Sequence, residues 1–123
     1  MPSAYQIDTG QRFIRVTYTG AFAVGDILAL QATLAADPEF SPDFVVLTDL
    51  RAAEPMEATG AGIEHVAEGS PFSPASKQAI LVSIDLHFGL ARMFEVYADR
   101  RSRVVRVFRD PEAAYAWLGV SPL

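Results

Sequence analysis

Histidine is the side chain most often used for acid–base catalysis, and this chain contains two, His65 and His87. Neither has a second ligand-type residue at a helical spacing such as four positions, so the sequence predicts no metal site. Glu64 and Glu68 accompany His65 in a pattern that an acid–base pair could use. A solvated, charged helix face produces the same pattern. We therefore expect both histidines to be structural, and we predict no catalytic, metal-binding or cofactor-binding residues.

A strand-end aspartate and a short glycine motif are the other features that could do chemistry. Asp49 follows the apolar run 44–47, and open α/β sheets place ligand-binding groups at the carboxyl ends of strands. Asp49 is thus a candidate polar site, although a bond to Arg51 or to backbone explains it more simply. Gly60-Ala61-Gly62 lacks the rest of a dinucleotide-binding fingerprint. We expect no cofactor there.

Five arginines form a basic cluster late in the chain, namely Arg100, Arg101, Arg103, Arg106 and Arg109. Such a cluster could contact an acidic partner or a phosphate. It is also typical of the solvent-facing side of an edge strand, where positive charge discourages edge-to-edge aggregation. We favour the second interpretation, with Asp99 and Asp110 partly offsetting the charge.

The whole-chain composition excludes several classes of protein. The 123 residues suit one domain, and the absence of cysteine excludes a disulfide scaffold, a thiolate zinc site and a cysteine nucleophile. A net charge of −5 argues against a nucleic-acid-binding domain, which needs a basic face. No apolar run approaches the roughly 20 residues of a membrane span, and residues 1–10 lack the features of a signal peptide. We expect a soluble, cytoplasmic domain.

Hydrophobic periodicity predicts alternating strands and helices across residues 1–123. The predicted strands are 5–8, 12–18, 44–47, 78–84 and 104–108, the helices are 24–36, 60–68, 85–99 and 111–118, and the polar loops are 49–59 and 69–76. Asp85 and Asp110 are the expected caps of the last two helices. An opening hairpin followed by βα units predicts an α/β fold with a mixed, mainly parallel sheet and about four helices.

The helix over 85–99 has a wider apolar stripe than a surface helix needs. Its expected core residues are Leu86, Leu90, Met93, Phe94 and Tyr97, with Phe88, Ala91 and Val96 beside them. The excess could be core packing, a pocket wall or the interface of a homodimer. In the dimer, Phe88 would be the anchor and Arg92 a rim contact to Glu95 of the partner helix. Alternatively, Phe88 packs within its own domain against Phe72.

Several stretches of the chain resemble the SpoIIAA-like family of small bacterial STAS-type proteins. The most specific is Phe88-Gly89-Leu90-Ala91-Arg92-Met93-Phe94, followed by the segments 105–109 and 113–118. Asp37-Pro38 and the strand end 46–51 occur in the expected order before it. The resemblance implies a superhelix of βα units around a mixed sheet, shared with anti-sigma-factor antagonists and CRAL-TRIO lipid-transfer domains.

The resemblance also implies a candidate phosphorylation site. In anti-sigma-factor antagonists, a loop with the sequence Asp-Ser-Ser-Gly carries a serine that a partner kinase phosphorylates. Here Glu57-Ala58-Thr59-Gly60 lies at the same offset, which places Thr59 at the phosphoacceptor position and Glu57 at the acidic one. The alternative is that Thr59 is only a helix cap.

Two functions follow from the resemblance, and both are non-enzymatic. The first is a regulatory module that binds a protein partner, and the second is a carrier of a small apolar ligand or lipid. A carrier needs a pocket of roughly some hundreds of Å³. Because most apolar residues are already assigned to one core, we expect too little chain to remain for such walls, and we favour the regulatory module.

Overall fold

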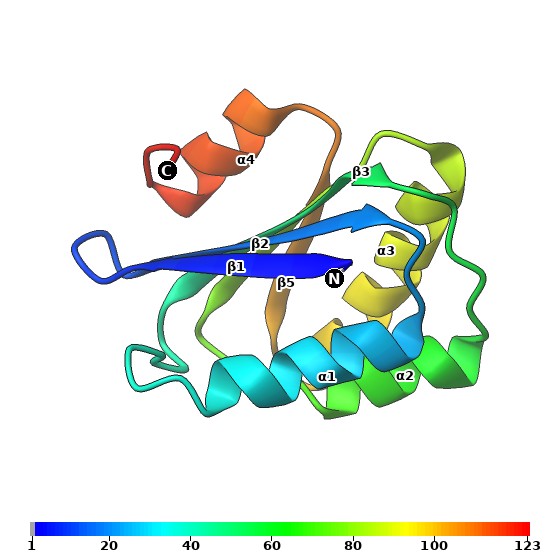
Figure 1. The fold of residues 1–123 in the computed structure, drawn as a ribbon, viewed down its shortest axis with the longest axis horizontal. Helices are drawn as coiled ribbons and strands as arrows, with labels where there is room; N and C mark the ends of the chain where they lie inside the picture. The colour runs from blue at the N-terminus through cyan, green and yellow to red at the C-terminus, as the bar shows by residue number, and fades with distance from the viewer. Residues whose placement is uncertain (1) are drawn as a thin grey trace.

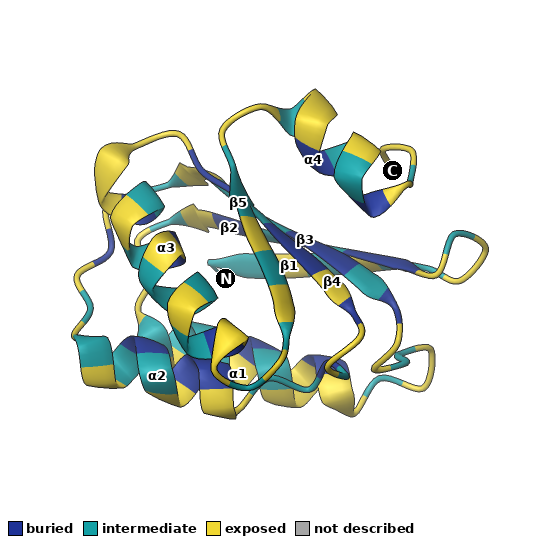
Figure 2. Cartoon of the chain, turned by 180° about the vertical axis from the view of Figure 1, so that it is seen from behind, coloured by how far each residue is buried: buried dark blue, intermediate teal, exposed yellow. Residues whose placement is uncertain are grey.

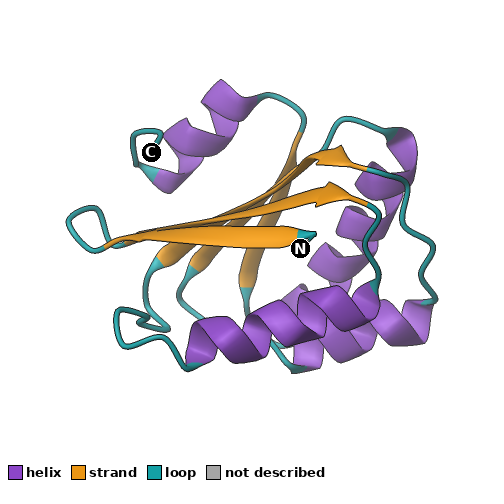
Figure 3. Cartoon of the chain, in the orientation of Figure 1, coloured by secondary structure: helices purple, strands orange, loops and turns teal. Residues whose placement is uncertain are grey.

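Residues 2–123 form a five-stranded sheet with helices on both faces in the computed structural model (Figures 1 and 3). The strands are β1 (Ser3–Asp8), β2 (Phe13–Gly20), β3 (Val45–Ala53), β4 (Lys77–Leu81) and β5 (Val104–Phe108). The helices are α1 (Val24–Ala35), α2 (Gly60–Glu68), α3 (Asp85–Asp99) and α4 (Pro111–Leu118). This architecture confirms the predicted α/β class, the opening hairpin and the four helices.

The strands lie in the sheet in the order in which they occur in the chain, β1-β2-β3-β4-β5. Only β1 and β2 pair antiparallel, with Tyr5 opposite Val16. The remaining pairs are parallel, so each crossover helix returns the chain to the next position along the sheet. The carboxyl ends of β2 to β5 therefore meet at one edge.

The sheet is covered on one face by α1, α2 and α3 and on the other by α4 (Figure 1). Alternation along β2 explains the two cores, because Ile14, Val16 and Tyr18 face the three helices while Phe13 faces α4. In β3, Val46 and Leu47 divide between the faces in the same way. Figure 2 shows the resulting buried centre of the sheet.

The largest differences from the predicted strand boundaries are at the ends of β3 and β4. β3 continues to Ala53, so residues 49–53 are not the predicted polar loop. The reason is backbone pairing: β2 offers partners for Asp49 and Ala52, and these hydrogen bonds outweigh the polar composition. β4 ends at Leu81 instead of residue 84, although Val82 still donates its N–H to the Phe108 carbonyl at 2.9 Å.

The span of α3 is as predicted, and four of its five expected core residues pack against the core. Leu86 is 45% exposed, so its assignment to the core is wrong. The helix is rotated so that His87, Ala91 and Ala98 are buried, while Leu90, Met93, Phe94 and Tyr97 are only partly buried against the core. The small alanines let the helix lie close to its neighbours. Asp85 is also not the cap, since Ile84 has the extended backbone of that position.

The caps of α4 are as predicted. Asp110 accepts a hydrogen bond from the Glu112 N–H at 3.1 Å, and Pro111 occupies the first helical position. Gly119 ends the helix with φ of 74°, a left-handed conformation that glycine adopts without strain.

No helix within residues 2–123 has both the length and the apolar character that crossing a membrane requires.

Candidate functional site

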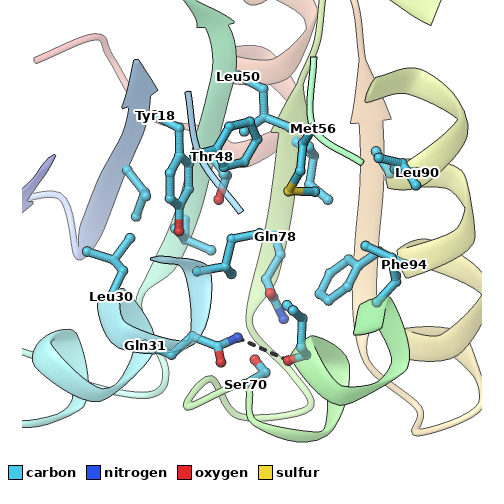
Figure 4. Close-up of a pocket in the computed structure, with 18 of the residues that line it drawn as sticks. Tyr18, Leu30, Gln31, Thr48, Leu50, Met56, Ser70, Gln78, Leu90 and Phe94 are labelled. Atoms are coloured by element: carbon cyan, nitrogen blue, oxygen red, sulfur yellow. Dashed lines mark hydrogen bonds between the residues drawn. The ribbon is translucent and has the colours of Figure 1, made fainter. Parts of the chain in front are cut away.

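A cavity of about 120 Å³ lies between the sheet and the three helices that cover its first face (Figure 4). Strands β2, β3 and β4 form its floor, and α1, α2 and α3 form its walls. Protein interiors normally contain few voids larger than a water molecule, so a space of this size in the main core is unusual.

Most of the cavity lining is apolar. The apolar residues that line it include Val16, Phe22, Ile27, Leu30, Leu34, Val46, Leu50, Met56, Ile63, Val66, Phe72, Ile80, Leu90, Ala91 and Phe94. Some of them lie on apolar faces that the periodicity predicted, whereas Leu50, Met56 and Phe72 come from segments predicted as polar loops. The same side chains hold the helices on the sheet and line the cavity. At about 120 Å³ the cavity is smaller than the pocket of roughly some hundreds of Å³ expected of a lipid carrier, so it suits only a smaller ligand.

The polar side chains in the lining carry no formal charge. No Asp, Glu, Lys or Arg is among the residues that line the cavity. Burial raises the pKa of Tyr18 well above its usual value, with a contribution from the negative charge of Asp26. Burial likewise lowers the pKa of His87. Tyr18 and His87 are thus both neutral at neutral pH.

Two residues in the lining have a buried polar atom without a hydrogen-bond partner, His87 at Nδ1 and Gln78 at Nε2. Of the two, Gln78 belongs to the sheet. It projects from β4 into the cavity, is only 6% exposed, and its Nε2 has no hydrogen-bond partner (Figure 4). By contrast, Gln31 donates from Nε2 to the Val66 carbonyl at 3.0 Å. Sequence reasoning did not single out Gln78. The available signal was a glutamine within the otherwise apolar strand run 78–82.

His87 joins the cavity wall to the loop before α2. Its Nε2 accepts a hydrogen bond from the Met56 N–H at 3.3 Å, and its ring packs edge-on against Phe22. This buried position agrees with the structural role expected from the sequence. His65 instead lies on the exposed side of α2, with Nδ1 at 3.9 Å from Glu68. Within residues 2–123, no three His, Asp or Glu side chains come together as a metal site would require.

Thr59 is the N-cap of α2. Its Oγ1 accepts a hydrogen bond from the Gly62 N–H at 3.0 Å, and the residue is exposed. Both the helix start at Gly60 and the exposure agree with the sequence-based expectation. Glu57 is also exposed, in the segment that precedes the cap. Helix capping alone explains why a hydroxyl side chain occurs at this position, so phosphorylation of Thr59 stays a prediction.

Asp49 lies on the opposite face of the sheet, so the structure does not bring it together with Thr59 and Glu57. The backbone N–H of Arg51 donates to it at 2.9 Å, and the Arg51 guanidinium makes two further hydrogen bonds at 2.9 and 3.1 Å. The Arg15 guanidinium lies 3.8 Å away. Burial alone would raise the pKa of Asp49, but the hydrogen bonds and charges of the arginines outweigh it and hold the pKa below its usual value.

The two interface candidates on α3 have partners within their own chain. The guanidinium of Arg109 lies 4.7 Å from the ring centre of Phe88, which is half-buried. Arg92 pairs with Glu95 of its own helix at 3.7 Å. Phe72 packs edge-on against Phe40 within the main core, against which Leu90 and Phe94 of α3 pack but Phe88 does not.

The late arginines lie in and around β5, the last strand in the sheet order: Arg106 is within it, and Arg100, Arg101, Arg103 and Arg109 lie before or after it. Arg101 pairs with Glu68 at 3.2 Å, and Arg109 pairs with Asp85 at 2.7 Å. These carboxylates, rather than the Asp99 and Asp110 expected from the sequence, offset the charge of the cluster. Arg103 donates to the carbonyl of Phe72 and ties the edge strand to the loop before β4.

Comparisons with known proteins identify the fold. No protein-family model matches the chain, and no curated protein matches it in sequence. A solved structure does match: an uncharacterized protein of the DUF3478 family with a SpoIIAA-like fold, from Shewanella loihica PV-4. It is 18% identical, the alignment covers 94% of this chain and 93% of that one, and the TM-score is 0.57. The chain therefore has a SpoIIAA-like fold, as the sequence resemblance implied.

Proposed function

We propose that this domain is a non-enzymatic binding module that takes a small, largely apolar molecule into the cavity between its sheet and α1–α3. The observation that carries the proposal is the cavity itself, about 120 Å³ in volume and lined mainly by apolar side chains. An engineered apolar cavity of about 150 Å³ in another protein binds benzene, so this somewhat smaller volume suits a ligand of about the size of a single six-membered ring.

The energetics of an empty cavity support this function. Apolar side chains that border an unfilled space lack the dispersion contacts that close packing would give them. A bound molecule would restore the missing contacts and stabilise the fold in proportion to its concentration.

Toluene is a suitable probe because it is small, apolar and uncharged. Titration followed by NMR should give saturable shifts of the Leu30 and Ile63 methyl groups, together with a rise in Tm. Ala91→Leu should weaken this binding at least about tenfold, because the larger side chain occupies the cavity. Ala113→Leu places the same change on an exposed site of α4 and should leave binding unchanged.

Two results would contradict the proposal. One is the absence of saturable shifts in the unsubstituted protein, and the other is equal binding by the Ala91→Leu and unsubstituted proteins. If Ala91→Leu disturbs folding, Ala91→Val provides a smaller reduction of the same space.

A second candidate function is regulation of a protein partner through phosphorylation of Thr59. Its support is the exposed position of Thr59 at the start of the nine-residue helix α2. Backbone N–H groups in the first turn of a helix are free to bind phosphate oxygens, and the added charge of about −1.5 to −2 would change the surface that a partner meets. Mass spectrometry of the protein isolated from its own cells should find phosphate on Thr59. A fully unmodified Thr59 under growth and stress conditions would contradict this function.

A further inference from the structure

The cavity contains a hydrogen-bond donor that the protein does not use. Gln78 lies in the central part of the sheet, between β3 and β5, and its side chain faces the cavity. It is 94% buried, since only 6% of it is exposed, and its Nε2 has no partner (Figure 4). A leucine or methionine at this position would satisfy the core without leaving an amide unpaired.

An unpaired buried amide is unfavourable, because the group has lost its hydrogen bonds to water and gained none in exchange. Most buried polar groups in proteins are paired, so an exception in the wall of a cavity needs an explanation. One explanation is a ligand that supplies the missing acceptor. The geometry allows it, because the amide lies next to the empty volume.

The rest of the lining restricts the charge of such a ligand. No Asp, Glu, Lys or Arg lines the cavity, so neither a carboxylate nor an ammonium group would find a counter-charge there. Burying an unpaired charge is far more costly than burying a neutral polar group. Tyr18 and His87, which also line the cavity, are both neutral at neutral pH because of their burial.

We infer that the ligand of this cavity is a small neutral molecule with one hydrogen-bond acceptor, such as a cyclic or short-chain ketone. Its carbonyl oxygen accepts a hydrogen bond from Gln78 Nε2, and its hydrocarbon part fills the apolar space between the sheet and α1–α3. The inference rests on the proposed function, since it requires that the cavity binds a ligand.

Two probes of nearly the same shape test the role of the acceptor. Cyclohexanone and methylenecyclohexane differ in whether the ring bears a carbonyl oxygen or a carbon in the same place. Their dissociation constants are measured by NMR titration against the unsubstituted protein and against Gln78→Leu. Loss of one partner of a buried hydrogen bond should lower ketone affinity relative to the alkene by about tenfold in Gln78→Leu.

Controls separate this effect from a general change in folding. Gln78→Met is a second variant of similar length, and it should give the same shift in preference if Gln78→Leu folds poorly. Gln6→Leu makes the same substitution at an exposed position of β1 and should leave the ratio of the two affinities unchanged. Cyclohexylammonium, a charged ring of similar size, should not bind.

The outcomes distinguish this inference from the proposed function. If neither ring compound nor toluene gives saturable shifts in the unsubstituted protein, the proposed function fails and the inference fails with it. If both ring compounds bind and their affinity ratio is the same with and without Gln78, the cavity binds ligands but the amide does not select them, and the inference alone is overturned. Binding of cyclohexylammonium as tight as that of cyclohexanone would overturn the neutral-ligand requirement.

Discussion

Asp49 shows how a single buried charge is stabilised at the centre of the sheet. It is the one carboxylate buried among residues 2–123, at 5% exposure, and three donors of Arg51 together with the nearby Arg15 compensate it. A site that satisfies its carboxylate so fully from within the chain has little capacity left for a ligand. Asp49 is thus a structural residue that ties β3 to β2.

Asp49→Asn should lower the free energy of unfolding at pH 7 by about 1–2 kcal/mol, because the hydrogen bonds lose their charge and both arginines lose their counter-ion. The pKa of Asp49 in the folded state lies below its value of about 3.9 in an unfolded chain. The unfolded state therefore binds more protons than the folded state between these two pKa values. The stabilisation that the Asp49 carboxylate provides is complete above about pH 4 and is lost as the pH falls through the folded-state pKa.

Urea denaturation at pH 7 and at pH 3 measures this effect. The difference between Asp49→Asn and the unsubstituted protein should shrink at the lower pH. Asp43→Asn changes an exposed aspartate in the same way and should have little effect at either pH. A difference that grows with acidification would contradict the assigned direction of the pKa shift.

Thr59→Ala should destabilise the protein by about 1 kcal/mol, the usual cost of losing an N-cap hydrogen bond. Thr59→Ser keeps the hydroxyl and should retain most of the stability. Chemical denaturation of both variants tests the capping role independently of any phosphorylation. Equal stability of Thr59→Ala and the unsubstituted protein would show that the cap contributes nothing.

At the scale of elements, α3 illustrates what periodicity can and cannot predict. The spacing of apolar residues predicted the bounds Asp85–Asp99 correctly. The most deeply buried residues of the helix are His87, Ala91 and Ala98, which the apolar spacing did not indicate, although Leu90, Met93, Phe94 and Tyr97 pack against the core as predicted. A polar ring can be buried when a backbone N–H donates to it, and no periodicity reveals that donor.

The cavity was unpredictable from the sequence for a related reason. Only part of its lining was predicted as core, since Leu50, Met56 and Phe72 lie in segments predicted as loops, and its volume depends on how far three helices stand from the sheet. Small differences in helix position decide whether facing side chains meet or leave a space. Likewise, Gln78 was placed in the correct strand, yet only its neighbours in space show that its amide is unpaired.

Phe94→Ala should lower the free energy of unfolding by about 3 kcal/mol, at the low end of the range for emptying an aromatic site, because Phe94 is only partly buried and already borders a void. Val96→Ala, at a position of α3 that is 52% exposed, should cost less than about 0.5 kcal/mol. Denaturant midpoints compare the two variants. A cost below about 1 kcal/mol for Phe94→Ala would show that this part of α3 does not hold the core.

At the scale of the whole molecule, association through α3 remains a prediction. Leu86 and Val96 are large apolar residues left exposed on this helix, and Phe88 is half-buried beside them in sequence. Two-fold dimers are the commonest soluble oligomers, and one apolar patch can meet its own copy across the axis. A dimer centred on Phe88 would have to displace or include the Arg109 guanidinium.

Sedimentation at micromolar concentration decides this point. We expect a dimer of the unsubstituted protein and a monomer of Phe88→Ser. A monomer of the unsubstituted protein across that range would contradict the dimer, and a Phe88→Ser dimer would place the interface elsewhere.

The order of strands in the sheet also has a consequence for how the chain is made. Because neighbours in the sheet are neighbours in sequence, each βα unit can join the edge of the sheet as it leaves the ribosome. The first face is complete once β5 has joined the sheet against α3, but the second face waits for α4. Until then Phe13, Leu47 and Leu81 present an uncovered apolar surface, which can aggregate or bind chaperones. The packing of α4 covers this surface and is the last step in folding the growing chain.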